Sequence, residues 1–520
     1  MDEVLVHLGR RPDKAGVRQP LVEPRGGDDE SKPPSAALMI TTAVAAVVTG
    51  NTGFALVRCV MNAWALPEDS LLTSNTWARE RLRWLAPLHA LALVVLAVAG
   101  AQLWWRARAA LDPSKLPAPP REHDARWDNL KFFATMAVAV AHFVSPFEEY
   151  APVLAVRMCQ EWWLMQTYVF MSGYLSAPRE QTPKRLRAIW GSLVGPYVVA
   201  QYMYLALIRL GWLVVGEASE HSWYAVAKIP PSFSLFSMFW NPWCLCWYLM
   251  TLVVWRVAAP LWTQLRRPLL CASAVAVLCG YVAFPSVSYA DGDFLRLKEA
   301  LAYFPYYILG VHARAREAAF RAALAWPGTR AAALAAAVAM VGGVLVNVAA
   351  FADFAPGCLA ARATPAHVGT LSTMAFYDDD DLDMTATFTD EYEGGAWVAL
   401  AWYGPAAALP AHALLVGAAV ALLGGDGRKI RHVSDAGANS IVNYVFHYVV
   451  VLALALLGFY NEYSVAKLVA AIAIAAAQSQ VWMAAPVATA LRSVLMPRQL
   501  PRLLLLDEEE PARVIGVAGV

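Results

Sequence analysis

The chain has 520 residues, of which 59% are hydrophobic and only 16% are charged, and its net charge is +1. Soluble globular proteins carry about 25% charged residues, so this composition excludes an ordinary soluble domain and predicts a polytopic membrane protein. The near-zero net charge gives no indication of a nucleic-acid partner.

The first 36 residues are polar and rich in Arg, Asp, Gly and Pro, and they begin without an apolar run. Such a segment does not resemble a cleaved signal peptide, so we expect the first membrane span to act as its own insertion signal. The composition of residues 1–36 predicts a disordered cytoplasmic tail.

The fold class predicted from hydropathy is an all-α transmembrane bundle of about twelve spans, because crossing the hydrocarbon layer takes about 20 mostly apolar residues. The twelve candidate segments are residues 37–60, 85–105, 131–147, 162–177, 189–215, 243–260, 269–285, 299–313, 331–352, 396–424, 438–459 and 464–488. The expected domains are two additional N-terminal helices within 37–106, a cytoplasmic linker at 107–125, a ten-span membrane domain at 126–490 and a cytoplasmic tail at 491–520.

Lys and Arg collect on alternate connections between these segments, which indicates the orientation of the chain. Basic residues cluster in the linker, near 179–187, at 266–267, at 314–321 and at 428–431, whereas residues 353–395 are acidic. The basic loop at 61–84 is the exception. This pattern predicts both termini in the cytoplasm and the acidic loop 353–395 on the other side. That loop lacks the spaced ligands and fixed glycine of an EF-hand, so we interpret it as a solvated loop rather than a calcium site.

The third segment, which contains "KFFATMAVAVAHF", carries a polar stripe. At helical spacing one face holds Asp128, Lys131, Thr135, Val138, His142 and Ser145. His142 lies about 16 Å beyond Lys131 along such a helix, near the centre of the bilayer. Ionisable groups at that depth usually face a bundle interior or a wet cavity. The alternative is a neutral histidine that is hydrogen-bonded to a backbone carbonyl.

A second polar face occurs in "GANSIVNYVFHYVV", where Asn439, Asn443 and His447 are spaced four residues apart. This segment also begins on the cytoplasmic side, so His447 is expected at the same depth as His142. The two histidines therefore predict a shared buried polar site. Interhelical hydrogen bonding alone would also account for the asparagines.

Six motifs occur in the order found in the acyltransferase 3 family of integral membrane acyltransferases, which the sequence resembles over residues 126 to 488. They are "RWDNLKFFATMAVAVAHF", similar to the family's R-x-D-x-L-R opening and Arg-x10-His, then "VFMSGYL", "KRLRAIWGSLVGPY", "WCLCWYLMTLVVWRVAAP", "LAYFPYYILG" and "AGANSIVNYVFHYVV". Two positions depart from the family pattern. Lys131 and Lys184 stand where the family has arginine, so each keeps the cation but loses the bidentate fork.

The resemblance implies an enzyme that moves an acyl group, often acetyl, from cytoplasmic acyl-CoA to a hydroxyl of a carbohydrate, lipid or small molecule. It implies His142 as general base, because an imidazole can accept the proton of an attacking alcohol, and Lys131 as a second catalytic residue at the cytoplasmic end of the same stripe. Acyl-CoA phosphates would contact Lys184, Arg185 and Arg187, although topology alone also requires a basic loop there. Supporting polar roles fall to Arg126, Asp128, Asn443 and His447. No bound cofactor and no metal is expected; the partners are the acyl-CoA donor, the acceptor and the lipid bilayer.

A secondary transporter is the alternative from another functional class, because buried histidines and Arg209 could belong to a substrate or proton path. The sequence contains no inverted repeat, which would favour a transporter. The tryptophans at 162, 163, 240, 243 and 247 are interpreted as interfacial belt residues.

Overall fold

The computed structural model describes residues 33–64, 75–111, 116, 124–147, 150–176, 182–216, 223, 226, 237–243, 245–280, 294–352 and 395–495. All secondary structure in these ranges is helical. Most of the two expected tails, most of the linker and residues 353–394 of the acidic loop lie outside them. The domain boundaries expected from the sequence therefore stay predictions.

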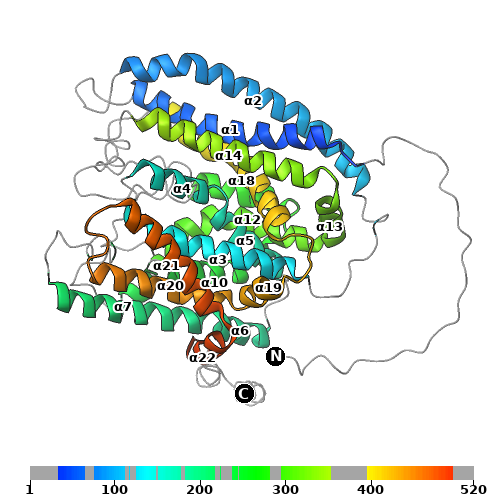
Figure 1. Cartoon of the computed structure of the whole chain (residues 1–520). Coiled ribbons are helices and arrows are strands. Elements are labelled where there is room, and N and C mark those ends of the chain that lie inside the picture. Colours follow the sequence, from blue (N-terminus) through cyan, green and yellow to red (C-terminus); the bar gives the residue numbers. More distant parts are fainter. Residues whose placement is uncertain are drawn as a thin grey trace, which may run out of the picture.

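The helices form one bundle around α3 (Arg126–Val144). Figure 1 shows α1 (Ala36–Trp64), α2 (Asn75–Ala110) and α14 (Thr329–Ala352) along one side, and α7 (Gly195–Val215) along the opposite side. Helix α3 contacts α5 (Leu164–Leu175), α18 (Gly395–Leu423), α19 (Arg431–Gly437), α20 (Ser440–Leu456) and α21 (Val465–Met483). The polar stripe of α3 therefore faces other helices rather than lipid.

The remaining helices connect or cover this bundle. They are η2 (Ser145–Phe147), α4 (Ala151–Glu161), α6 (Pro183–Ile189), the π-helical turn η3 (Trp190–Val194), α9 (Ser237–Trp240), α10 (Cys246–Trp262), α11 (Pro268–Val275), η4 (Ala276–Gly280), η5 (Phe294–Arg296), α12 (Leu297–Ala315), α13 (Glu317–Ala325) and α22 (Ala485–Leu495).

The expected count of twelve spans is not confirmed. Among the described residues, seven helices are long and apolar enough to cross a membrane, or eight if α19 and α20, which meet at 77°, form one broken span. The segments at 162–177, 243–260, 269–285 and 299–313 form helices but are not among these eight. Helices α5 and α10, for instance, have 12 and 17 residues, too few for a straight crossing.

Two glycines let α5 and α12 approach each other at backbone distance. A Cβ on Gly173 would lie 2.0 Å from the Tyr307 carbonyl oxygen, and one on Gly310 would lie 2.1 Å from the Phe170 carbonyl oxygen. Only a residue without a side chain permits this approach, which is typical of helix pairs in membranes. The α5–α12 pair holds the "VFMSGYL" and "LAYFPYYILG" motifs against each other.

The belt interpretation is wrong for two of the tryptophans. Trp162 and Trp243 are each only 2% exposed and belong to the main core, whereas Trp240 is 40% exposed. Their burial among helices explains the difference, because a belt residue must reach the membrane surface.

Candidate active site

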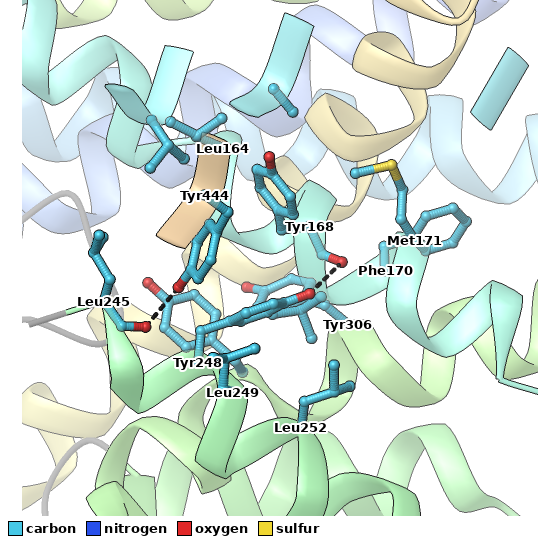
Figure 2. Close-up of a cluster of buried hydrophobic side chains, with 14 of the residues drawn as sticks. Leu164, Tyr168, Phe170, Met171, Leu245, Tyr248, Leu249, Leu252, Tyr306 and Tyr444 are labelled. Atoms are coloured by element: carbon cyan, nitrogen blue, oxygen red, sulfur yellow. Dashed lines mark hydrogen bonds between the residues drawn. The ribbon is translucent and has the colours of Figure 1, made fainter. Parts of the chain in front are cut away.

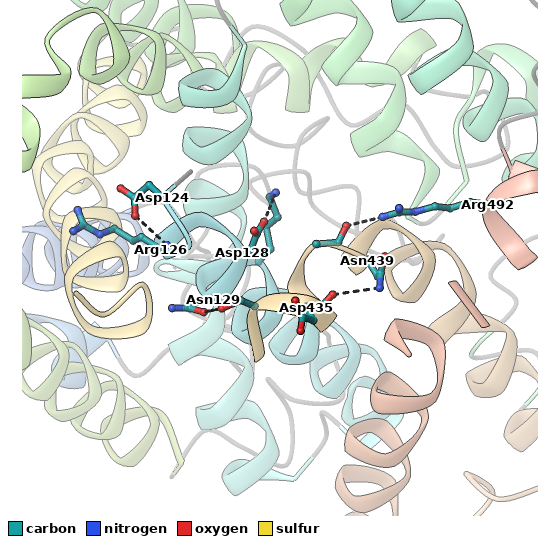
Figure 3. A network of polar contacts seen from close by, with 10 residues as sticks. Asp124, Arg126, Asp128, Asn129, Asp435, Asn439 and Arg492 are labelled. Carbon is teal, nitrogen blue, oxygen red and sulfur yellow. Dashed lines mark hydrogen bonds and ion pairs between the residues drawn. The ribbon is translucent and has the colours of Figure 1, made fainter. Parts of the chain in front are cut away.

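The site begins at the first turn of α3, where Lys131 pairs with Asp128. Their Nζ and Oδ1 atoms are 3.1 Å apart, and the side chains are 27% and 10% exposed. The carboxylate thus holds the cation at the start of the stripe (Figure 3).

Asn129 joins this turn of α3 to a segment some 300 residues further along the chain. Its Nδ2 donates to the carbonyls of Gly424 and Arg428 at 3.2 Å each, and its Oδ1 accepts the Ser434 hydroxyl at 2.6 Å. Asn129 is 1% exposed. The hydrogen bonds fix the end of α18 and the start of α19 against α3. Sequence reasoning missed Asn129, because its position on the helix carries no signal of partners so distant in sequence.

Gly437 brings the end of α19 onto the same turn of α3. A Cβ on Gly437 would lie 1.8 Å from the Asp128 carbonyl oxygen, so any larger residue would displace one helix. Immediately after Gly437 the chain turns by 77° into α20. The break therefore directs α20 along α3 from the Lys131 end.

Arg126 lies at the rim of this end. Its backbone N–H donates to Asp124 Oδ1 at 3.1 Å, while its Nε and Nη1 atoms are buried with no hydrogen-bond partner among the described residues. Asp124 also pairs with Arg321 at 3.3 Å, and Arg321 pairs with Glu317 at 2.8 Å. Partial burial of Arg321 opposes its charge, but the hydrogen bond to Glu317 and the two carboxylates outweigh it and raise its pKa. The rim therefore keeps its positive charge.

The two predicted histidines meet at the inner end of the stripe. The rings of His142 and His447 are 5.4 Å apart between centroids, tilted by 35°. Tyr448 stands edge-on to His142 at 5.2 Å, and Trp243 stands edge-on to Tyr448 at 5.3 Å. The structure thus brings together His142 and His447, as expected from their matched depth, and adds two aromatic neighbours.

His447 has a defined tautomer. Its Nδ1 lies 2.9 Å from the backbone carbonyl oxygen of Asn443, which can only accept a hydrogen bond. The Nδ1 atom therefore carries the proton in the neutral ring, and Nε2 keeps its lone pair. His447 is fully buried, and this Nε2 has no hydrogen-bond partner among the residues that the structure describes. His142 is only partly buried.

Tyrosines line the region between the two ends of the stripe. The Thr135 hydroxyl bonds to Tyr168, and the hydroxyl of Tyr248 contacts Ser172 Oγ at 2.6 Å and the Tyr168 carbonyl at 3.3 Å. Tyr444, one turn before Tyr448 on α20, donates to the Leu245 carbonyl at 2.7 Å. Figure 2 shows Tyr168, Tyr248 and Tyr444 packed together. Tyr168, Tyr248 and Tyr444 therefore form a wall beside α3 that is held by hydrogen bonds.

The predicted acyl-CoA loop forms α6, which begins at a Thr182 cap that accepts the Arg185 N–H at 3.3 Å. Arg185 is partly buried, and its Nη2 approaches the Arg256 carbonyl of α10 at 3.5 Å. Arg187 is also partly buried. The side chain of Lys184 lies outside the described part of the chain. Of the cations predicted to bind the CoA phosphates, Arg185 thus contacts the backbone of α10, and Lys131 contacts the carboxylate of Asp128.

Two further buried histidines were missed in the sequence. His412 on α18 is fully buried, with Nδ1 2.8 Å from the Tyr306 hydroxyl and its ring edge-on to Trp162 at 4.9 Å. His89 on α2 is 3% exposed and bonds to Thr52 and Tyr403. Both lie in strongly apolar helices without a polar stripe, so periodicity gave no signal.

Other expectations can be placed as well. Arg209 is exposed on α7, so it does not line a buried path. Within the described ranges no group of three or more His, Cys, Asp or Glu side chains could hold a metal ion.

Comparison with known proteins agrees with these features. Residues 124–485, well over half of the chain, match the family model described as an acyltransferase domain. Neither a curated protein nor a solved structure matches the chain. The match spans the α3 stripe, the tyrosine wall and the α20–α21 pair. Together with the apolar helices, it identifies the protein as an integral membrane protein of a transferase family. The chain belongs to the acyltransferase 3 family.

Proposed function

We propose that the protein transfers an acyl group, with acetyl as the simplest case, from cytoplasmic acyl-CoA to a hydroxyl of a carbohydrate, lipid or small molecule. The observation that carries this proposal is the pairing of His142 with His447, 5.4 Å apart, at the inner end of a stripe that starts at Lys131. Membership of the family supports acyl transfer as the reaction. The histidine pair provides an imidazole that can accept the proton of a hydroxyl.

The reaction needs one proton acceptor and one proton donor, and a single imidazole can serve as both. The acceptor hydroxyl attacks the thioester carbonyl carbon while His142 removes its proton. The carbon–sulfur bond then breaks, the protonated His142 returns the proton to the departing CoA sulfur, and an ester and a free thiol remain.

Exposure supports His142 rather than His447 as this base. His142 is partly exposed and can meet a substrate, whereas His447 is fully buried. Two imidazoles this close disfavour double protonation, so His447 stays neutral when His142 carries the proton. The free lone pair on His447 Nε2 can then accept a hydrogen bond from the acceptor hydroxyl or from protonated His142.

The donor would enter from the Lys131 end. Lys131 and the α6 cations Lys184, Arg185 and Arg187 supply positive charge for the phosphates of CoA. Basic connections favour the cytoplasm, so in this proposal the Lys131 end and both termini lie on the cytoplasmic side. Arg126 and Asp128 would hold the entrance, and Asn443 with His447 would complete the inner site.

The proposal is tested with purified protein in lipid nanodiscs supplied with acetyl-CoA labelled in the acetyl group. We expect CoA release coupled to acetylation of glycans or lipids extracted from the host membrane, identified by mass spectrometry. Empty nanodiscs with the same acetyl-CoA provide the baseline, which is spontaneous hydrolysis of the thioester. CoA release that never exceeds this baseline, with any acyl-CoA and any extract, would contradict the proposal.

A further inference from the structure

Ser479 on α21 fixes the orientation of two amide side chains. Its hydroxyl donates to the Ala475 carbonyl at 2.7 Å, which uses its only proton. Its oxygen then accepts Nδ2 of Asn443 at 3.0 Å and Nε2 of Gln478 at 3.2 Å. Gln478 Nε2 also lies 3.3 Å from the Ala475 carbonyl. Because Ser479 can offer only lone pairs to the two amides, their N–H groups must face it.

The amide oxygens consequently point away from Ser479. Asn443 Oδ1 and Gln478 Oε1 are both buried, and neither has a hydrogen-bond partner in the described part of the chain. Asn443 is fully buried and Gln478 is 9% exposed. Buried acceptors without a donor are costly and rare in folded proteins. Two of them, held by one serine, form a pair of acceptors that the N–H or O–H donors of a ligand would satisfy.

Their location is between the Lys131 end and the histidines. Asn443 lies one helical turn, about 6 Å, before His447 along α20. Gln478 lies near the end of α21, the helix that returns to the Lys131 end. There Asn439 Nδ2 donates to the Met483 carbonyl at 3.1 Å. A donor molecule with its phosphates at Lys131 and its thioester at His142 would span the depth at which Asn443 lies.

We propose that Asn443 Oδ1 and Gln478 Oε1 accept the two amide N–H groups of the pantetheine arm of acyl-CoA. This inference rests on the proposed function. The arm carries its two amides between the thioester and the phosphates. This order matches the protein, in which Asn443 lies at a depth between His142 and Lys131. Ser479 is the positioning residue, because it holds both oxygens toward the arm without touching it.

The helices around this site are interrupted at two places. The α19–α20 break lies at 438–439, and α21 ends at Met483, one residue before α22 begins at Ala485. Asn439 and Arg492 tie the two breaks together, since Arg492 of α22 donates to the Ala438 carbonyl at 2.6 Å (Figure 3).

The test combines a change in the ligand with a change in the protein. Wild type and Gln478→Met are compared with acetyl-CoA and with analogues in which one pantetheine amide N–H is replaced by an ester oxygen. In wild type we expect each replacement to raise the KM for the donor by roughly tenfold, with kcat nearly unchanged, as for one lost hydrogen bond. In Gln478→Met, the amide N–H that would bind Gln478 Oε1 has already lost its acceptor. The analogue that lacks this N–H should therefore have the same donor KM as acetyl-CoA in that variant.

Gln160→Met is the matched control. Gln160 is partly buried and, like Gln478, has a buried Oε1 without a hydrogen-bond partner among the described residues, but its Nε2 donates to the Ala137 carbonyl on α3. It should respond to both analogues as wild type does. Ser479→Ala should raise the donor KM, and Ser479→Thr, which keeps the hydroxyl, should restore it. Thermal unfolding of each variant checks that it is folded.

Several results would overturn the inference. If wild type has the same KM for the ester analogues as for acetyl-CoA, the inference is wrong, and this result does not depend on whether the variants fold. The inference is also wrong if Gln478→Met and each of the two analogues raise the donor KM by independent factors that multiply. A change in the KM of the acyl acceptor alone would assign the oxygens to that substrate instead. Wild type without any transfer from acetyl-CoA would overturn the proposed function itself.

Discussion

At the scale of single residues, Lys131 and Asp128 show how the α3 stripe keeps its charge. Asp128 is only 10% exposed in its side chain, so its carboxylate depends on the nearby ammonium of Lys131. A partly buried carboxylate that loses its cation must regain water or take up a proton, and either change costs stability. The same lysine stands where the family has arginine. Replacing Lys131 by methionine removes the positive charge, whereas replacing it by arginine keeps the charge and changes only the shape of the cationic group.

We predict that Lys131→Met lowers the free energy of unfolding by about 1–3 kcal/mol and raises the KM for acyl-CoA, whereas Lys131→Arg preserves both. Denaturant unfolding in detergent and donor titrations measure the two effects. Lys429→Met is the control, because Lys429 and Asp435 form a 2.7 Å pair that is 63% and 55% exposed. Exposed pairs contribute little. Equal losses in the two variants would contradict this account of Lys131.

The meeting of α3 and α20 could be predicted from the sequence, but the partners of their polar side chains could not. The spacing of Thr135 and His142 on α3, and of Asn443 and His447 on α20, was sufficient to expect a shared site. The partner of Thr135 was not predictable, because Tyr168 comes from another helix and hydropathy does not encode which faces meet. The roles of these residues in catalysis stay predictions.

At the scale of helices, close approach of backbones determines which motifs meet. Gly310 lets α12 touch the backbone of α5, and Gly437 lets α19 touch the start of α3. A methyl group at either position would push apart helices that carry site residues. Such contacts are invisible to a hydropathy pattern, since glycine and alanine both count as small apolar residues.

We predict that Gly310→Ala lowers the melting temperature by several degrees, because its Cβ would lie 2.1 Å from the Phe170 carbonyl oxygen. Gly342→Ala on α14 is the control, since no atom lies within 4 Å of its Cβ position. That variant should keep or raise the melting temperature, because alanine favours helices over glycine by about 1 kcal/mol. Melting curves in nanodiscs measure both, and a harmless Gly310→Ala would show that the α5–α12 approach is not required.

At the scale of the whole molecule, the two N-terminal helices belong to the same bundle as the family domain. The family match begins at residue 124, yet α1 packs against α14 and α18. His89 of α2 lies between Thr52 of α1 and Tyr403 of α18. Thr52 donates its proton to the Val48 carbonyl at 2.7 Å, so it accepts from His89 Nδ1, and His89 Nε2 accepts from Tyr403.

We predict that His89→Leu costs about 1–3 kcal/mol of unfolding free energy, because it leaves the Tyr403 hydroxyl and a lone pair of Thr52 without their partner. His432→Leu, on the exposed face of α19, should cost little. Denaturant unfolding compares the two variants. A neutral His89→Leu would mean that α1 and α2 dock without this bridge.

The sequence predicted the class of the molecule better than its internal arrangement. Composition and hydropathy were sufficient for an all-helical membrane protein, and six ordered motifs were sufficient for the family. The number of spans was not predictable, because hydropathy reads α5 and α10 as spans although their helices have only 12 and 17 residues. Burial of Trp162 and Trp243 was missed for a related reason, since a tryptophan in an apolar segment suits both a core and a membrane surface.

The central claim is that His142 accepts the proton of the acyl acceptor. Single-turnover transfer of labelled acetyl from acetyl-CoA, measured in nanodiscs for wild type, His142→Gln and His432→Gln, tests it most directly. We predict that His142→Gln slows transfer by at least about 100-fold, the usual contribution of a general base, while CoA still raises its melting temperature as in wild type. His432→Gln should transfer at the wild-type rate. A folded, CoA-binding His142→Gln that transfers acetyl as fast as wild type would contradict the claim.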